Sequence, residues 1–553
     1  MKNHKLTLVI IVLGAILRFA FITQFPVSLN WDEVSHGYNA FSILKTGQDE
    51  WGTRLPLIFR AFGDYKLPVY IYATVIPVAL FGLSTFSVRF VSALAGSLAV
   101  LGIYLLTNVL YPKSQILNLK SKITAGHFAA FFLAISPWHF FISRPALEAN
   151  LALTLIIFGA YFLVRSFTNS KFYLLSSIFL SLSLHTYNTA RVFVPLFLLV
   201  IFIRERRKIK WDKLFILGLS IFILAFSLVI YQVKTGEGTA RYQKLAILSP
   251  DRVFQLGQLR QNSLLPKPMP RLIYNRPVYF VTTFLKNYFS YYSPRFLTQN
   301  KGAQSQFAIP GQNLFGVTIT FIFLLGLTLA AKNYRSSPGH LFLLVWLLLA
   351  PVAAGTTIDP PQALRPNPLI ISVVILSATV AFAIAKSKNK KLLALIIIMP
   401  LVEMSIYLAN YLGPYAMSYS SSWQYGYQPV FDLLKQESYQ GRTVIITKRY
   451  GEPHIFYAFY NRVDPSILQD KDRSLRFKQS DWFWTDKIDN VYFVNDWDIP
   501  NGHTDKIRLE SGGFISTQNT ILVTSPGQVP QNTTPITTIN YLDGKPAFVV
   551  VSF

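Results

Sequence analysis

LFLLVWLLLAPVAA at residues 341–354 and LLALIIIMPLV at residues 392–402 contain no charged side chain. The whole chain of 553 residues is 52% hydrophobic and 15% aromatic, and only 14% of its residues are charged. Typical soluble proteins carry about 25% charged residues. So few charges could not cover the surface of a soluble protein of this length. The composition therefore predicts a polytopic α-helical membrane protein.

Apolar runs that are long enough, or nearly long enough, to cross a bilayer recur along the chain. We expect about eleven transmembrane helices, near residues 7–26, 87–110, 124–140, 148–164, 172–186, 190–203, 213–233, 313–331, 339–357, 368–385 and 392–410. The first run has a basic start like a signal peptide, but no small-residue cleavage site follows it, so we expect an uncleaved helix.

Short basic loops separate many of these runs, and such loops commonly face the cytoplasm. They contain Lys113, Lys120 and Lys122, Arg165 and Lys171, the segment 204–210, Lys332 and Arg335, and the segment 386–391. With a cytoplasmic N-terminus, this pattern places the C-terminus outside the cytoplasm. The apolar segment 67–83 must then not cross fully. It contains Pro68 and Pro77, and we expect it to lie against or dip into the outer leaflet.

The net charge of +26 is unevenly distributed. Residues 411–553 hold 13 basic and 14 acidic side chains, whereas residues 1–410 hold 39 basic and 12 acidic ones. The excess therefore lies in the membrane part, which argues against a nucleic-acid partner. The absence of cysteine excludes disulfides and thiolate metal sites.

Two domains are expected from this distribution. Residues 1–411 form the transmembrane domain, which includes an outer loop at 27–86 and another at 234–312. Residues 412–553 alternate helix-like and strand-like segments, such as Glu452–Asn461 and Thr520–Thr524. This alternation predicts a soluble, extracytoplasmic α/β domain.

Five of the twelve acidic residues before 411 lie in the single loop after the first apolar run: Asp32, Glu33, Asp49, Glu50 and Asp64. Asp32 and Glu33 follow that run closely, so they are expected near the outer membrane surface. A carboxylate there could act as a general base toward a hydroxyl group. The structural alternative is that Asp32 caps a surface helix running from Glu33 to Leu44.

Isolated cations are expected at the same outer face. They are Lys66, Arg89, Arg144, Arg191 and Arg365. Each alone could be an anchor that reaches the interface. Together with the acids they suggest a site for an anion at the membrane surface, and a lipid-linked phosphate fits because Lys and Arg pair strongly with phosphate oxygens. Glu148 could simply pair with Arg144 one helical turn away.

The order of these motifs resembles the GT-C class of glycosyltransferases, in particular the bacterial type of family 39. That family includes the protein O-mannosyltransferases and the aminoarabinose transferases that act on lipid A. The similar features are the acidic pair, Lys66-Leu-Pro68, Phe81-Gly…Phe86-Ser-Val-Arg89, Ser143-Arg-Pro-Ala-Leu-Glu-Ala-Asn150 and Asp359-Pro-Pro-Gln-Ala-Leu-Arg365. Leu67 and Gln362 depart from the pattern, since many relatives have proline and bacterial relatives often have histidine at these places.

The resemblance implies a GT-C-like fold and a membrane glycosyltransferase that moves a hexose or pentose, with inversion, from a polyprenyl-phosphate-linked sugar to a hydroxyl group outside the cytoplasm. The acceptor would be a glycan, a lipid or a protein, and the enzyme would lie in the plasma or inner membrane. Carried over by motif, Asp32 is the catalytic base with Glu33 as its companion. Lys66, Arg89, Arg144 and Arg365 would bind the donor phosphate.

Four secondary candidates for this site are Asp64, Glu148, Tyr187 and Arg191. The histidines lack metal-ligand spacing, and a requirement for a divalent metal stays open, with no cofactor assigned. Two other function classes remain as alternatives. One is a transporter or flippase of a lipid-linked saccharide, and the other is a non-catalytic scaffold whose outer domain binds a partner.

Overall fold

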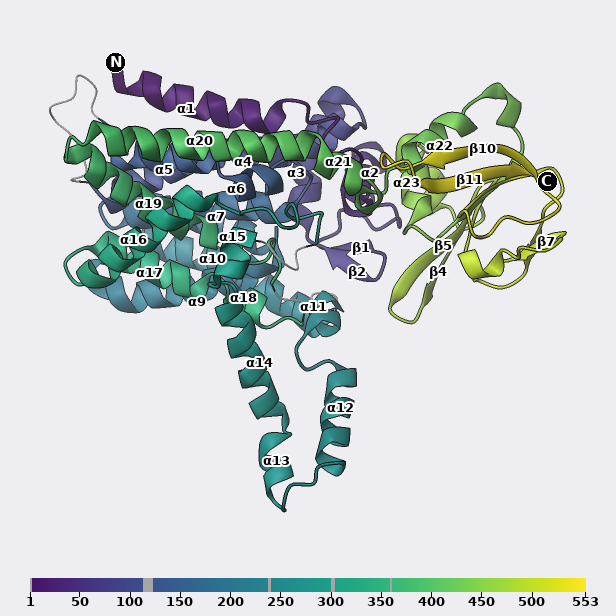
Figure 1. Ribbon diagram of the computed structural model, residues 1–553. Coiled ribbons are helices and arrows are strands. Elements are labelled where there is room, and N and C mark those ends of the chain that lie inside the picture. Colours follow the sequence, from purple (N-terminus) through teal and green to yellow (C-terminus); the bar gives the residue numbers. More distant parts are fainter. Residues whose placement is uncertain (1, 113–122, 237–239, 300–303, 359–360) are drawn as a thin grey trace. The chain divides into compact units, whose positions relative to one another are not determined.

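The computed structural model of the protein describes residues 2–112, 123–236, 240–299, 304–358 and 361–553 (Figure 1). The chain divides into two compact units, one formed by 1–20 and 92–408 and the other by 21–91 and 409–553. The predicted domain boundary at 411 and 412 stays a prediction. In the structure the loop 27–86 belongs to the same unit as the C-terminal residues.

The first unit is helical, and its second stretch of chain begins within α4. Its helices are α1 (Lys2–Phe19), α4 (Thr85–Leu110), α5 (Ala125–Ala134), α6 (Pro137–Ile142), α7 (Glu148–Ser166), α8 (Lys171–Leu184), α9 (Asn188–Glu205), α10 (Lys213–Lys234), α11 (Ala240–Leu245), α12 (Pro250–Gln261), α13 (Met269–Ile273), α14 (Arg276–Ser290), α15 (Pro294–Gln299), α16 (Val317–Asn333), α17 (Pro338–Leu349), α18 (Val352–Gly355), α19 (Leu369–Lys386) and α20 (Lys390–Leu412).

Each of the eleven predicted apolar runs contains a helix. Among the described residues, six helices are long and apolar enough to cross a membrane: Thr85–Leu110, Glu148–Ser166, Lys213–Lys234, Pro338–Gly355, Leu369–Lys386 and Lys390–Ser418. Four apolar helices are shorter. The protein is thus a helical membrane protein as predicted, and the count of eleven spans stays a prediction.

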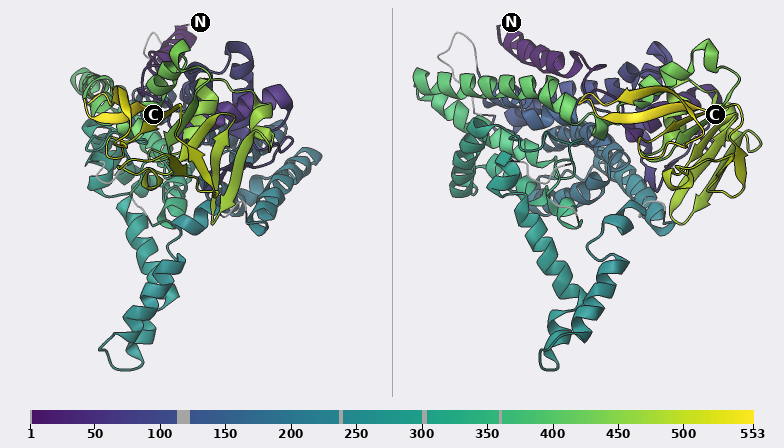
Figure 2. Two further views of the ribbon diagram at one scale, coloured as in Figure 1. Left: turned by 90° about the vertical axis from the view of Figure 1, so that its right-hand side faces the viewer. Right: turned by 45° about the vertical axis from the view of Figure 1, so that its right-hand side comes forward.

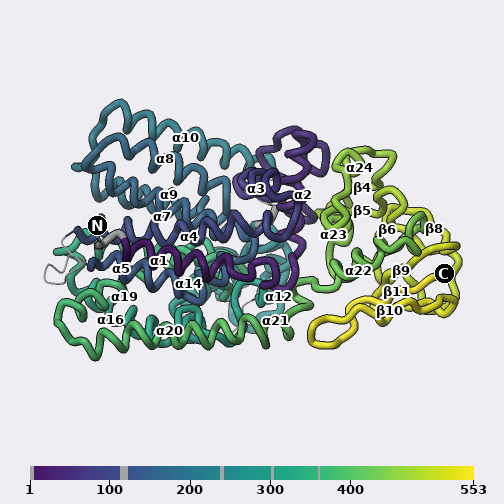
Figure 3. The backbone as a smooth tube through the Cα atoms, turned by 90° about the horizontal axis from the view of Figure 1, so that it is seen from above, coloured from purple at the N-terminus to yellow at the C-terminus, as the bar shows by residue number. Residues whose placement is uncertain are grey.

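Glycines allow close helix packing in this unit. A Cβ atom on Gly159 of α7 would lie 2.5 Å from Leu180 Cδ2 of α8, and one on Gly326 of α16 would lie 2.5 Å from the Leu376 carbonyl oxygen of α19. Small residues at such positions let the helix backbones approach closely within membranes. Figure 3 shows α7, α8 and α10 side by side, in agreement with their contacts.

The predicted loop 234–312 is largely helical where it is described. Helices α12, α13 and α14 project away from the other helices of this unit (Figures 1 and 2). The basic loop of Lys113, Lys120 and Lys122 lies outside the described residues.

The second unit combines the first outer loop with the C-terminal segment. The loop contributes α2 (Trp31–Thr46), β1 (Phe59–Ala61), β2 (Asp64–Lys66) and α3 (Pro68–Phe81), and the C-terminal segment contributes α21 (Pro414–Ser418), α22 (Tyr427–Leu434), β3 (Thr443–Thr447), α23 (Pro453–Tyr460), α24 (Pro465–Gln469), β4 (Ser474–Gln479), β5 (Trp482–Ile488), β6 (Val491–Val494), β7 (Lys506–Arg508), β8 (Phe514–Ser516), β9 (Thr520–Thr524), β10 (Thr534–Asn540) and β11 (Pro546–Ser552).

Helix α3 occupies the apolar segment expected not to cross the membrane. It has 14 residues, which rise about 21 Å at 1.5 Å per residue. The hydrocarbon core of a bilayer is about 30 Å thick. The length of α3 therefore agrees with a helix that does not cross fully.

A seven-stranded sheet, in the order β10-β11-β9-β3-β6-β5-β4, forms the core of the C-terminal segment. Strand β3 pairs in parallel with both β6 and β9, and the outer pairings are antiparallel. The predicted α/β character is confirmed. The sequence pattern does not predict strands β4 and β10. Most of their side chains are exposed or half-buried and lack a regular apolar alternation.

Candidate active site

The acidic pair lies in the first turn of α2, but neither acid is the N-cap. Asn30 caps the helix, because its side chain accepts a hydrogen bond from the Glu33 amide at 3.0 Å. Glu33 Oε2 in turn accepts one from the Asn30 amide at 3.2 Å, which completes a capping box. The alternative in which Asp32 caps a helix starting at Glu33 is therefore wrong. The helix starts at Trp31, and Asp32 is its second residue.

Asp32 presents an accessible carboxylate. Its side chain is 35% exposed and accepts a hydrogen bond from Lys66 Nζ at 2.5 Å, whereas the Lys66 side chain is only 6% exposed. Lys66 ends β2, which pairs with β1 in a short antiparallel hairpin. Residues 34 positions apart are thereby brought together.

Glu33 lies in the opposite environment. It is buried and forms a two-pronged ion pair with buried Arg89, with Nε–Oε1 at 2.9 Å and Nη2–Oε2 at 3.1 Å. Arg89 also donates to the carbonyl oxygens of Ile22, Pro26 and Ser28 at 2.6–2.9 Å. A guanidinium group has five N–H donors, and these contacts engage all five.

Arg89 therefore fixes the segment between α1 and α2 rather than presenting free donors. The predicted phosphate contact of Arg89 stays a prediction, and the hydrogen bonds favour a positioning role for it. Breaking such a buried pair would leave an uncompensated charge in the interior.

The other acids of the loop have structural partners. Asp49 Oδ1 accepts from the amides of Trp51 and Thr53 at 2.9 and 2.8 Å, and burial raises the pKa of its carboxyl group. Glu50 forms a buried ion pair with Arg476 at 2.7 Å. Asp64 accepts from the adjacent Tyr65 amide at 2.7 Å. Asp32 thus combines a partly exposed carboxylate with a cationic partner, whereas the ion pairs of Glu33 and Glu50 are buried.

The first residue of α2 is held by residues that the sequence analysis did not single out. The Trp31 amide donates to Gln424 Oε1 at 2.8 Å, and Gln424 Nε2 donates to the Tyr450 carbonyl oxygen at 2.6 Å. Gly451 has a φ of +115°, and a Cβ there would lie 2.4 Å from Trp31 Cε3. This contact between residues 31 and 451 has no local sequence signal except a glycine between Tyr450 and Glu452.

A buried acid lies next to this contact. Glu452 Oε1 accepts from Trp482 Nε1 at 2.7 Å, and Oε2 lies 3.5 Å from His454 Nδ1. Burial raises the pKa of Glu452 to about 8. Burial also lowers the pKa of His454 well below its ordinary value. Both groups are therefore largely uncharged near neutral pH, as expected for ionisable groups out of contact with water.

The remaining candidates belong to the helical unit. Arg144 Nη1 donates to the carbonyl oxygens of Leu17 at 2.8 Å and Arg18 at 3.3 Å. Arg365 Nη1 donates to Thr357 Oγ1 at 2.8 Å. Arg191 donates to the Leu184 carbonyl oxygen at 3.0 Å and to Gln232 Oε1 at 2.5 Å. Glu148 is the first residue of α7, and Tyr187 precedes α9 as its N-cap.

Gln362 has a local structural role. Its side-chain oxygen accepts from the amides of Leu364 and Arg365 at 3.1 and 3.0 Å, so it closes a turn. Asp359 of the same motif lies outside the described residues. Within the described residues, no group of three or more His, Asp or Glu side chains is placed to hold a metal ion.

Glu403 in α20 caps a neighbouring helix. Its Oε1 accepts from both the amide and the hydroxyl group of Thr318 at 3.0 and 2.9 Å, at the start of α16. A carboxylate is favourable at a helix N-terminus. This acid therefore has a structural explanation.

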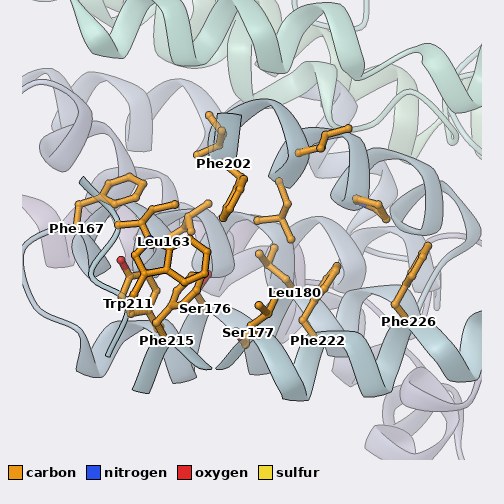
Figure 4. Close-up of a pocket in the computed structure, with 17 residues that line it drawn as sticks. Leu163, Phe167, Ser176, Ser177, Leu180, Phe202, Trp211, Phe215, Phe222 and Phe226 are labelled. Atoms are coloured by element: carbon orange, nitrogen blue, oxygen red, sulfur yellow. The ribbon is translucent and has the colours of Figure 1, made fainter. Parts of the chain in front are cut away.

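An apolar cavity of about 390 Å³ lies between α7, α8, α9 and α10 (Figure 4). Its lining includes Leu163, Phe167, Trp211 and Phe222, and the polar residues that line it are Tyr173, Ser176 and Ser177. The cavity contains no group suited to proton transfer from a hydroxyl, so the carboxylates of α2 remain the candidate for chemistry.

Comparison with known proteins bears on the fold of the chain. Residues 66–231 match the family model of the dolichyl-phosphate-mannose-protein mannosyltransferases, which is less than a third of the chain. ArnT from Cupriavidus metallidurans, solved bound to undecaprenyl phosphate, is 12% identical and has a TM-score of 0.54, and the match covers 98% of this chain and 97% of that chain. The chain has the GT-C fold.

The apo structure of the same ArnT gives a TM-score of 0.53 at 11% identity, covering 100% of this chain and 98% of that chain. AglB, the Archaeoglobus fulgidus oligosaccharyltransferase, solved with an inhibitory peptide and a dolichol-phosphate, is 15% identical with a TM-score of 0.50, covering 95% of this chain and 69% of that one. The chain spans 64% of the length of the apo form of that oligosaccharyltransferase. No curated protein sequence matches the chain. The GT-C resemblance drawn from the sequence motifs is confirmed, and the roles of individual GT-C site residues stay predictions.

Proposed function

We propose that this protein is a membrane glycosyltransferase that transfers a hexose or pentose from a polyprenyl-phosphate-linked sugar to a hydroxyl group of a glycan, lipid or protein. The observation that carries the proposal is the accessible Asp32 carboxylate, placed in the first turn of α2 and held by Lys66. The GT-C fold supports it, because ArnT, which shares this fold, was solved with undecaprenyl phosphate.

The reaction needs one base and a stabilised leaving group. The acceptor oxygen attacks the anomeric carbon while its proton passes to the Asp32 carboxylate. The bond from the anomeric carbon to the phosphate oxygen breaks, and its electron pair stays on that oxygen. A single displacement of this kind inverts the anomeric carbon. The phosphate needs no proton to leave if cations compensate its charge.

Lys66 can serve both groups. We propose that the Lys66 ammonium group, which has three donors, holds Asp32 and contacts a phosphate oxygen of the bound donor. Glu33 and Arg89 position α2 through their buried ion pair. We assign Arg144 and Arg365 to the donor phosphate as secondary contacts, and Asp64, Glu148, Tyr187 and Arg191 as further candidates around it.

The positions of the basic loops support a reaction outside the cytoplasm. The clusters at 204–210 and 386–391 would face the cytoplasm with the N-terminus. The loop that carries Asp32 and the C-terminal segment would then lie on the extracytoplasmic side of the plasma or inner membrane. A lipid-linked donor delivers its sugar at that surface.

The decisive experiment is transfer from a labelled polyprenyl-phosphate sugar by the purified full chain in nanodiscs. Asp32→Asn should lower the rate at least about 100-fold, since loss of a general base typically costs 10²–10⁴-fold. The variant should stay folded, with a melting temperature lowered only by the loss of the partly exposed ion pair with Lys66. The matched control is Asp251→Asn, because Asp251 is the second residue of α12, as Asp32 is of α2, and is also exposed.

A wild-type rate in the Asp32→Asn variant would overturn the assignment of the base. Movement of labelled lipid-linked sugar across the vesicle membrane without any transfer would instead favour the transporter.

A further inference from the structure

A polar cavity of about 470 Å³ lies in the C-terminal segment, separate from the carboxylates of α2. It is lined by Lys448, Arg449, Tyr450, Trp484, Asn495, Asp496 and Trp497. No side chain of this lining takes part in the proposed chemistry of Asp32; the carbonyl oxygen of Tyr450 only accepts from Gln424, which holds the Trp31 amide. The cavity therefore needs its own explanation.

The cavity lies where parallel strands end. Lys448 follows β3 and Asn495 follows β6, and the two parallel strands are joined beyond their ends by a bond from the Lys448 amide to the Val494 carbonyl oxygen at 2.7 Å. Ser525 follows β9, which is parallel to β3 on its other side. The chain passes from β3 to β6 on one side and then returns to β9 on the other. In open α/β sheets, ligands bind outside the carboxyl ends of strands at such a reversal of strand order.

Asp496, which follows β6, is fixed at this edge by residues that end or follow the two other parallel strands, β3 and β9. Its Oδ1 accepts from Thr447 Oγ1 at 2.8 Å, and its Oδ2 accepts from Ser525 Oγ at 2.8 Å and from Arg449 Nη1 at 3.3 Å. The carboxylate is thus buried and oriented before any ligand arrives. Preorganised polar groups of this kind fix the orientation of a small ligand.

The cations at the cavity are already compensated by acids. Lys448 Nζ lies 2.5 Å from Asp486 and 2.9 Å from Glu510, and Arg449 pairs with Asp496. Two cations thus face three carboxylates, which gives no excess of positive charge to attract an anion. This balance disfavours a phosphate or another anionic ligand and favours a neutral polar one.

An exposed aromatic ring completes the cavity. Trp497 lines the cavity and is 78% exposed, so its ring is open to a ligand in the cavity. Trp484 also lines the cavity, and Lys448 Nζ is 5.0 Å from its ring centroid. A flat apolar surface beside oriented donors and acceptors matches a sugar ring, which has apolar C–H faces and a rim of hydroxyl groups.

We propose that this cavity is a binding site for a neutral saccharide, with Trp497 as the stacking surface and Arg449, Asn495 and Asp496 as hydrogen-bonding partners. The saccharide can belong to the acceptor or to the sugar of the lipid-linked donor. The site goes beyond the proposed transfer reaction, because saccharide binding here does not require Asp32.

The test is calorimetric titration of the full chain in sugar-free nanodiscs with mannobiose, cellobiose, N,N′-diacetylchitobiose and inorganic phosphate. We expect at least one disaccharide to bind saturably and phosphate not to bind. Trp497→Ala should weaken disaccharide binding at least about tenfold, as expected for an aromatic anchor. The matched control is Phe514→Ala, since Phe514 is 69% exposed in the same domain but lies outside the cavity lining.

A second variant separates this site from the active site. Asp32→Asn should keep disaccharide binding even where it abolishes transfer, so the two proposals can fail independently. The inference is overturned if no disaccharide binds, if phosphate binds more tightly, if Trp497→Ala binds like the wild type, or if Asp32→Asn also loses binding. Transfer assays with the Trp497→Ala variant then show whether the bound saccharide belongs to the acceptor or to the donor. A raised KM for the acceptor identifies the acceptor, and a raised KM for the donor identifies the donor sugar.

Discussion

At the scale of single residues, two consecutive acidic residues lie in opposite environments. Asp32 is partly exposed beside Lys66, whereas Glu33 is buried against Arg89. Successive residues of a helix point about 100° apart, because 3.6 residues make one turn. Neighbouring acids can therefore face solvent and core, and the two should respond differently to substitution.

Glu33→Gln should destabilise the protein by about 3–5 kcal/mol, because it leaves the buried guanidinium of Arg89 without its counter-charge. The measurement is thermal unfolding of the full chain in nanodiscs. Glu437→Gln is the control, since Glu437 is exposed. Equal stability of the two variants would contradict the positioning role assigned to Glu33.

Glu452 should make stability depend on pH. Burial raises its pKa from an ordinary 4.5 to about 8, so between these values the folded state holds a proton that the unfolded state has released. The contribution of Glu452 to the free energy of unfolding is therefore fully present below about pH 4.5 and is lost as the pH rises to about 8. Glu452→Gln keeps an acceptor for Trp482 but cannot ionise.

Melting temperatures of the wild type and Glu452→Gln at pH 5 and pH 8 check this expectation. The wild type should lose more stability than the variant between the two values. The difference between the proteins isolates Glu452 from His454, whose lowered pKa acts in the opposite direction because its unfolded state binds the extra proton. Identical pH profiles would show that Glu452 is ionised in the folded protein.

At the scale of elements, the start of α2 depends on two residues of the C-terminal segment, Gln424 and Gly451. Gln424 holds the Trp31 amide, and Gly451 packs against the Trp31 ring. The position of Asp32 follows from these contacts, since it is the next residue of the helix.

Gly451→Ala should therefore lower transfer activity about tenfold or more, because a misplaced base costs rate even without a change in its chemistry. The matched control is Gly441→Ala. Gly441 also has a positive φ, +76°, but no atom lies within 4 Å of a Cβ built there. Both variants carry backbone strain, and only Gly451→Ala displaces Trp31. Equal activities would mean that this contact does not position Asp32.

At the scale of the whole molecule, the outer loop and the C-terminal segment form one compact unit. Arg476 reaches back to Glu50 across 426 residues, and Gln469 Nε2 donates to Ser42, Thr46 and Asp49. From the sequence, the C-terminal domain was expected to be an addition to a separate catalytic domain. The contacts show that the loop carrying Asp32 shares its core.

Deletion of residues 429–553 should consequently abolish both transfer and the folding of the outer loop, because Glu50 would lose its buried partner. A milder test compares two arginines of the same domain. Arg476→Met breaks the buried pair with Glu50 and should lower the melting temperature strongly. Arg473→Met breaks the exposed pair with Asp489 and should change the melting temperature little. Exposed ion pairs contribute about 0–1 kcal/mol to the free energy of unfolding. Full activity of the deletion variant would contradict this dependence.

The sequence alone determined the class of the protein, the places of its helices, the acidic cluster after the first helix and the balanced charge of the C-terminal segment. These properties are local or compositional. An apolar run must avoid water wherever it folds, and a strand such as Thr520–Thr524 is apolar enough to be recognised by itself.

Only the tertiary structure decided which acid of the pair is accessible, that Arg89 binds Glu33, that the loop and the C-terminal segment share one core, and that a polar cavity forms at the ends of β3 and β6. The physical reason is that each of these features joins side chains whose mutual distance no local periodicity encodes. A carboxylate in the sequence is compatible with a base, a cap or a buried ion pair, and the partners that the fold places beside it decide among them.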